Sequence, residues 1–160
     1  LHVGVTEAGS LIRGTVKSAI AMGKLLEEGI GDTIRISLTD DPVEEVKASM
    51  ALLETLGLRT GGVEFVSCPT CGRTKIDLMS IVNEVEKRSG AIIRRLQKEN
   101  RKIKVAMMGC VVNGPGEASD ADVGIAGGVN EGLLFKKGQP VCKVPQDKIV
   151  DVLIDEMEKL

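Results

Sequence analysis

The pattern of hydrophobic and polar positions over the first 60 residues predicts strands and helices in alternation. Two β-rich segments of alternating polarity predict the strands, and apolar residues at helical spacing predict a helix after each. The expected elements are a strand over 2–6, a helix over 10–28, a strand over 33–38 and a helix over 41–57. The apolar positions of the first helix are Leu11, Ile12, Val16, Ile20 and Leu25. This order is typical of parallel α/β units, as in a (β/α)8 barrel or an open doubly wound sheet.

Local signals place the start of the second helix and a boundary between two domains. Asp41 is a preferred capping residue, Pro42 suits the first helical turn, and Glu44 stands at the capping-box position. The pair Gly61–Gly62 separates this α/β pattern from a different arrangement. We therefore expect one domain over 1–60 and a second over 61–160.

The second domain is also predicted to be α/β, with more strands and a hairpin. Its expected elements are strands over 63–67, 104–108 and 123–126, a helix over 77–88 with a second segment to 99, a hairpin of 133–135 and 141–144, and a final helix opened by Pro145. Lys137-Gly138 lies between the two strands of the hairpin.

Composition excludes several classes of function. The 160 residues include no Trp or Tyr, two Phe and one His, and the formal charge is −2. Without aromatic residues there is no platform for stacking nucleic-acid bases, and one histidine cannot supply HExxH zinc chemistry. No apolar run is long enough to span a bilayer, and no signal peptide is visible at the first residues, so we expect no membrane or nucleic-acid partner and a cytoplasmic location. The chain opens without Met inside a strand and resembles the later part of a longer protein.

Four cysteines indicate where the chemistry lies. Cys68 and Cys71 form a Cys-x-x-Cys turn after one predicted strand, and Cys110 follows another. Side chains at strand ends converge outside a parallel sheet, so these three thiols are expected to meet and to bind a metal or a cluster. The fourth ligand is open at this point between Cys142 and Glu117.

Two alternatives to a cluster remain open. A structural zinc site would need all four cysteines, including Cys142, whereas an iron–sulfur cluster tolerates a missing thiolate. Cys142 lies in a predicted hairpin strand, which favours a free thiol there. The Cys-x-x-Cys turn alone would also suit a thiol–disulfide redox protein.

Three motifs carry a resemblance to a known family. They are HVGVTEAG at 2–9, SCPTCGR at 67–73 and MGCVVNGPGEA at 108–118. Together they resemble the C-terminal part of the 4-hydroxy-3-methylbut-2-en-1-yl diphosphate synthases, enzymes of the non-mevalonate isoprenoid pathway. The resemblance implies the last βα units of a TIM-type barrel over 1–60, followed over 61–160 by an α/β iron–sulfur domain similar to those of nitrite and sulfite reductases.

The resemblance also implies the cofactor and its ligands. The family holds one 4Fe-4S cluster with three cysteines and one glutamate. Carried over to this sequence, the ligands are Cys68, Cys71, Cys110 and Glu117. Cys142 has no counterpart among them.

Three further residues are candidates for catalysis or substrate binding. By the resemblance, Glu7 faces the cluster as an acid/base residue. Ser37, near the end of a predicted strand, is a candidate to bind a phosphate oxygen, with a satisfied strand-end hydroxyl as the alternative. Asn113 is a candidate substrate contact, with a turn-forming role as the alternative.

The activity that the resemblance implies is a reductive ring opening. The family converts 2-C-methyl-D-erythritol 2,4-cyclodiphosphate to 4-hydroxy-3-methylbut-2-enyl diphosphate; two electrons enter and water leaves. Flavodoxin or ferredoxin is the usual donor, and in the family's homodimer the cluster domain of one subunit covers the barrel of the other. Because most of the barrel is absent from these 160 residues, we expect this chain alone to be inactive.

Overall fold

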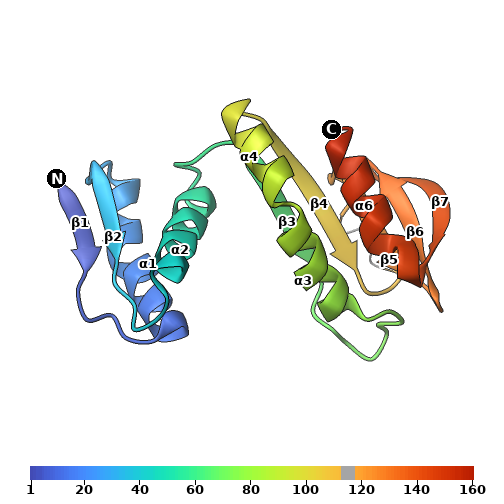
Figure 1. Cartoon of the computed structure of the whole chain (residues 1–160), viewed down its shortest axis with the longest axis horizontal. Helices are drawn as coiled ribbons and strands as arrows, with labels where there is room; N and C mark the ends of the chain where they lie inside the picture. The colour runs from blue at the N-terminus through green and yellow to red at the C-terminus, as the bar shows by residue number, and fades with distance from the viewer. Residues whose placement is uncertain (113–117) are drawn as a thin grey trace. The chain divides into compact units, whose positions relative to one another are not determined.

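A computed structural model describes residues 1–112 and 118–160 of the chain. Contacts between residues divide it into two units, Leu1–Thr60 and Gly61–Leu160 (Figure 1). In the part that the structure describes, no helix is both long enough and apolar enough to cross a membrane.

The first unit consists of two parallel strands with a helix after each. Its elements are β1 (His2–Val5), α1 (Leu11–Glu27), β2 (Thr33–Ile36) and α2 (Pro42–Thr55). The four predicted elements are confirmed, although both strands end earlier than predicted. Val5 lies opposite Ile36, so the carboxyl ends of the two strands are level. The loops that follow β1 and β2 therefore start at the same edge of the sheet.

Helix α1 packs through a different face from the one that its predicted apolar positions indicate. Its apolar stripe is largely exposed within the first unit, with Ile12 at 78% and Ile20 at 63%. The buried positions are Gly14, Ser18, Met22, Gly23 and Leu26, of which all but Gly23 are spaced four residues apart. Three of these are small, which allows the helix to lie close to its neighbours.

The predicted start of α2 is confirmed in part. Asp41 caps the helix, since its carboxylate accepts a hydrogen bond from the Val43 N–H at 2.9 Å, and Pro42 opens the first turn. Glu44 pairs instead with a lysine one turn later, at 2.6 Å. The neighbouring Glu45 accepts a hydrogen bond from the backbone N–H of Leu38 at 2.8 Å and so connects α2 to the loop after β2.

The second unit is built on a five-stranded mixed sheet in the order β3-β4-β5-β6-β7. The strands are β3 (Gly62–Ser67), β4 (Lys102–Met108), β5 (Val123–Gly127), β6 (Glu131–Lys136) and β7 (Gln139–Pro145). The first three are parallel, and β6 and β7 form the predicted antiparallel hairpin. All five strands are longer than predicted. The turn at Lys137–Gly138 has positive φ at both residues, as a tight two-residue hairpin turn requires.

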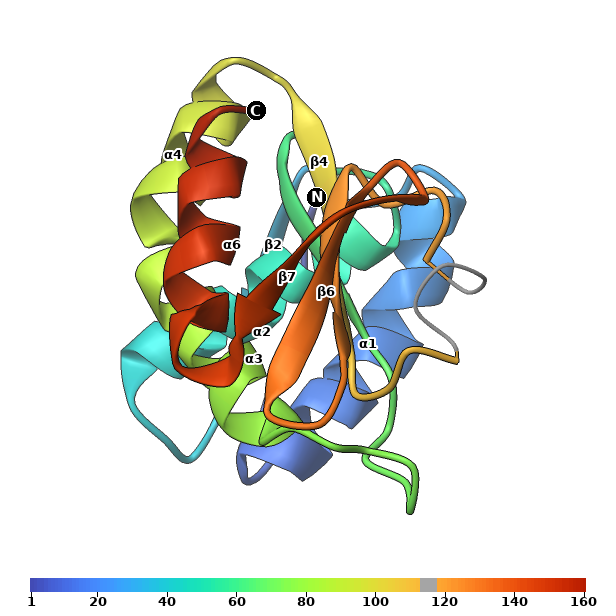
Figure 2. The ribbon, with the colours of Figure 1, turned by 90° about the vertical axis from the view of Figure 1, so that its right-hand side faces the viewer.

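Helices cover one face of this sheet. They are α3 (Leu78–Arg88), α4 (Gly90–Lys98) and α6 (Ile149–Glu158), the last entered through the 3₁₀ turn η1 (Gln146–Lys148). Figure 2 shows α3, α4 and α6 on the same side of the strands. The predicted helix pair 77–99 and the helix after Pro145 are thereby confirmed.

Strand β4, which lies between β3 and β5, is buried on both faces, as expected for a parallel strand inside a sheet. Val105 and Met107 belong to the core beneath the helices, whereas Ala106 and Met108 pack with Phe135 on the other face. All five side chains are at most 2% exposed. The rigid end of β4 leads directly to Gly109 and Cys110.

Candidate metal centre

Two parallel strands bring the cysteine segments to one edge of the sheet. Cys68 follows directly after β3, and Cys110 comes two residues after β4. Ser67 lies opposite Met107 in the parallel register, so the two strands end at nearly the same level. Cys71 lies in the loop that continues from Cys68. The carboxyl edge of a parallel sheet is where ligands bind in open α/β folds.

Gly109 connects these segments through its backbone. Its N–H donates a hydrogen bond to Sγ of Cys68 at 3.2 Å, and its carbonyl accepts one from the N–H of Lys75 at 3.0 Å. The same glycine precedes Cys110 in the chain. Gly109 thus contacts Cys68, precedes Cys110 and is hydrogen-bonded to the loop that carries Cys71.

The three thiols differ in exposure. Cys110 is buried at 6%, Cys68 is half-buried and Cys71 is exposed. The pKa of Cys71 is lowered, chiefly by a hydrogen bond from the backbone of Arg73, then by its side chain, with a smaller contribution from Thr74. A lowered pKa favours the thiolate, which is both the nucleophilic and the metal-binding form of cysteine.

The donor set is one that an iron–sulfur cluster can use. Among residues 1–112 and 118–160, no group of three His, Cys, Asp or Glu side chains is arranged to hold one metal ion. In a multi-iron cluster the cysteines bind different irons, so their sulfur atoms need not converge on one point. Three soft thiolates at one sheet edge, with a backbone N–H already directed at one sulfur, have the chemistry that such a cluster requires.

The predictions on Asn113 and Glu117 lie outside the described residues. Cys142 is described, and it lies in β7, paired with Leu134. Because β7 and β3 are opposite edges of the five-stranded sheet, Cys142 and Cys68 are separated by four strand spacings, about 19 Å along the sheet. Cys142 is exposed, and its distance from Cys68 argues against a four-cysteine zinc site.

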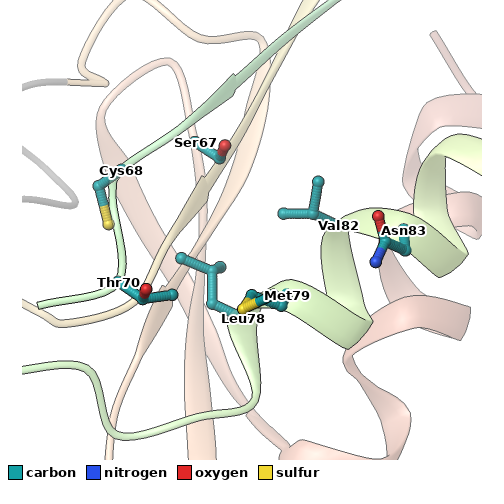
Figure 3. Close-up of a pocket in the computed structure, with 7 residues that line it drawn as sticks. All are labelled: Ser67, Cys68, Thr70, Leu78, Met79, Val82 and Asn83. Atoms are coloured by element: carbon teal, nitrogen blue, oxygen red, sulfur yellow. The ribbon is translucent and has the colours of Figure 1, made fainter. Parts of the chain in front are cut away.

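A small pocket opens beside Cys68. It lies between the end of β3 and the first turns of α3, and its cavity volume is about 170 Å³. Figure 3 shows Ser67, Cys68 and Thr70 on one side and Leu78, Met79, Val82 and Asn83 of α3 on the other. One side of Cys68 is therefore accessible from the surface of the second unit.

Glu7 and Ser37 occupy corresponding positions in the first unit. Ser37 is the first residue after β2, and Glu7 is the second after β1. The N–H of Thr39 donates a hydrogen bond to the carbonyl of Gly9 at 2.9 Å, which joins the two loops. The backbone of Glu7 has φ 53°, a left-handed conformation that costs free energy in any residue with a side chain.

Residue-type reasoning did not identify the residues that organise the cysteine loops. Thr74 accepts a hydrogen bond from the N–H of Cys71 at 3.2 Å, and Gly109 binds Cys68 as described above. The only sequence signal for Thr74 is its position three residues after Cys71, where a hydroxyl often closes a turn. Nothing in the sequence marks Gly109 except its place before Cys110.

Comparisons with known proteins identify the family of both units. Residues 64–159 match the family described as "GcpE protein C-terminal domain", and residues 1–50 match "GcpE TIM-barrel domain". A TIM-barrel portion followed by a distinct C-terminal domain agrees with the predicted fold class at this level.

Three similar proteins carry one name, "4-hydroxy-3-methylbut-2-en-1-yl diphosphate synthase (flavodoxin)". They come from Clostridium acetobutylicum, with 61% identity, Ruminiclostridium cellulolyticum, with 58%, and Geobacter sulfurreducens, with 54%. Each match covers all of this chain and 43–44% of the relative. The chain thus spans less than half the length of these relatives, and the resemblance seen in its motifs is confirmed: it belongs to the GcpE family, whose C-terminal domain accounts for most of its length.

Proposed function

We propose that this chain is the C-terminal part of a 4-hydroxy-3-methylbut-2-en-1-yl diphosphate synthase. The whole protein would reduce 2-C-methyl-D-erythritol 2,4-cyclodiphosphate with two electrons and two protons, opening the ring, releasing one water and forming the allylic diphosphate. The observation that carries the proposal is the assembly of three cysteine segments around Gly109, whose N–H already donates to Sγ of Cys68. The names of the relatives support the same activity.

Cys68, Cys71 and Cys110 would hold one 4Fe-4S cluster, with Glu117 as the fourth ligand. When bound, the cluster would supply the two electrons that the reaction consumes. The thiols lie in different surroundings. Cys110 is buried two residues after β4 and would anchor the site, whereas Cys71 lies in an exposed loop.

The first unit would supply groups that act on the substrate. Glu7 lies at the carboxyl end of β1, the face on which barrel enzymes carry their chemistry, and would hold the proton that the departing oxygen needs. Ser37, at the corresponding end of β2, would donate its hydroxyl to a phosphate oxygen. Asn113, three residues after Cys110 in the sequence, would also contact the substrate.

The partners follow from the same assignment. The relatives' name includes flavodoxin, and we propose flavodoxin, with ferredoxin as the other candidate, as electron donor. The C-terminal unit would belong with the nitrite and sulfite reductase domains. In a homodimer it would cover the barrel of the partner subunit, in the cytoplasm, where thiols stay reduced.

The experiment is metal analysis of the full-length protein purified without oxygen. We expect brown protein with broad visible absorbance and roughly four irons per chain. Cys68→Ser and Cys110→Ser should each lose the iron, while Cys142→Ser, a matched change outside the site, should keep it. Colourless protein with one zinc would contradict the proposal.

One observation favours a second candidate, a thiol–disulfide redox protein. Cys71 is exposed and its pKa is lowered, as in reactive Cys-x-x-Cys motifs. That function needs only Cys68 and Cys71. Iron-free protein in which Cys110→Ser leaves disulfide exchange unchanged would therefore favour this candidate over the synthase.

A further inference from the structure

The loop that carries Cys71 is closed by two hydrogen bonds to a single threonine. The N–H of Cys71 donates to Oγ1 of Thr74 at 3.2 Å, and the N–H of Thr74 donates to the carbonyl of Cys71 at 3.0 Å. Together the bonds close a four-residue turn at both its backbone and its side chain. The place of Cys71 in this exposed loop therefore depends on Thr74.

The side chain of Thr74 also lies directly against Gly109. A Cβ atom built on Gly109 would stand 2.8 Å from both Cγ2 and Oγ1 of Thr74, closer than real Cβ contacts come. Thr74 thus occupies the space that any side chain at position 109 would need. The next residue, Lys75, adds a backbone hydrogen bond to the carbonyl of Gly109 at 3.0 Å.

These contacts form one continuous path between the cysteine segments. It runs from Cys71 through Thr74 to Gly109, which precedes Cys110 and donates to Sγ of Cys68. Each step is a hydrogen bond, a van der Waals contact or a peptide bond within the protein. The protein's own contacts thus set the relative places of the three thiols, and such preorganisation lowers the cost of ordering them when a cluster binds.

We propose that Thr74 is a positioning residue that holds the Cys71 loop against Gly109 and so sets the spacing of the cluster ligands. This inference rests on the proposed function for the identity of the ligand, whereas the contacts themselves are made by the protein's own residues. The side chain has two tasks. Oγ1 accepts the hydrogen bond from Cys71, and Oγ1 and Cγ2 together fill the space beside Gly109.

Three variants of the full-length protein separate these tasks. Thr74→Val keeps the shape of the side chain and removes the acceptor, while Thr74→Ser keeps the acceptor and removes the methyl group. Thr70→Val, the same change at an exposed threonine in the same loop, is the matched control.

The first measurement is hydrogen exchange of the peptide 68–76 in iron-free protein. Thr74→Val should speed exchange of the Cys71 amide about fivefold, the factor that corresponds to one ordinary hydrogen bond. Thr74→Ser and Thr70→Val should stay close to the wild type. Unchanged exchange in Thr74→Val would overturn the inference, whether or not the protein binds iron.

The second measurement is the rate at which the reconstituted protein releases iron to a chelator. Thr74→Val should release it about fivefold faster, and Thr74→Ser should restore most of the wild-type rate. Equal release from Thr74→Val and wild type would overturn the inference and leave the proposed function standing. Wild-type protein that takes up no iron would instead contradict the proposed function.

Discussion

Gly127 provides a direct test of how closely the end of β4 is packed. It is the last residue of β5 and is fully surrounded. A Cβ atom at this position would lie 2.6 Å from the carbonyl oxygen of Gly109, 2.9 Å from its carbonyl carbon and 2.8 Å from Cγ1 of Ile76. Two of these atoms belong to the backbone and cannot rotate away. Gly127→Ala therefore requires the Gly109–Cys110 segment to move by several tenths of an ångström.

The expected cost follows from two opposing contributions. Overpacking of a well-packed interior costs about 1–3 kcal/mol. Replacing glycine by alanine restricts the unfolded chain and returns about 0.4–1 kcal/mol. Gly127→Ala should therefore reduce the free energy of unfolding by about 1–2 kcal/mol. Gly128→Ala is the matched control, because its nearest contact, Glu131, lies at an ordinary 3.4 Å.

The assay is equilibrium unfolding in urea. Because of the distribution of aromatic residues, fluorescence follows the unfolding of the second unit only. The chain has no Trp or Tyr, and its two phenylalanines, Phe65 and Phe135, both belong to the second unit. Phenylalanine fluorescence therefore reports on that unit alone. With a slope of about 1–3 kcal/mol per molar urea, the midpoint should fall by roughly 0.5–1 M in Gly127→Ala.

The same variant should weaken the metal site, because Gly109 binds Cys68 and precedes Cys110. We expect full-length Gly127→Ala to retain less iron than Gly128→Ala after identical reconstitution. If both variants unfold at the wild-type midpoint and hold equal iron, the close packing of β5 on Gly109 would be refuted.

Three other predictions concern single side chains. Arg73→Gln removes the side-chain contribution that helps to lower the pKa of Cys71. In iron-free protein, alkylation of this cysteine at neutral pH should therefore slow, and the pH profile of alkylation should move to higher pH. Lys75→Gln is the control and should leave both the rate and the profile unchanged. Glu7→Asn should raise the free energy of unfolding of the first unit by about 0.5–1 kcal/mol in thermal melts, because asparagine adopts the left-handed backbone more readily, whereas Glu7→Gln should not. Cys142→Ser should leave the iron content of full-length protein unchanged; loss of iron would mean that the ligand assignment is wrong.

The sequence predicts the elements well because each is marked by local chemistry. Asp41 and Pro42 mark the start of α2, and the change of pattern at Gly61–Gly62 coincides with the division of the chain into two units. The ends of strands are less certain: β2 ends at Ile36 rather than at residue 38. Strand ends depend on where a neighbouring strand stops pairing, and β1 stops at Val5.

The buried face of α1 could not be predicted from hydrophobicity. Periodicity identifies Ile12, Val16 and Ile20 as one stripe, yet it does not show which elements lie against it. Within the first unit the helix packs instead through a row that begins with Gly14 and Ser18, and the stripe stays exposed. A row of small residues allows close approach but carries little hydrophobic signal.

In the candidate site, too, the sequence reveals some residues and not others: it reveals the proposed ligands but not the residue that sets their spacing. Cysteines attract attention by their chemistry, so Cys68, Cys71 and Cys110 could be selected from type and spacing alone. Their arrangement depends on Gly109, which contributes an N–H, a carbonyl and the absence of a side chain. A search by residue type finds the atoms that would bind iron and misses the backbone that sets their distances. Thr74 and Gly127 both lie close to Gly109. Substitutions at these two residues should therefore change how tightly the chain holds iron, although none of the proposed ligands is replaced.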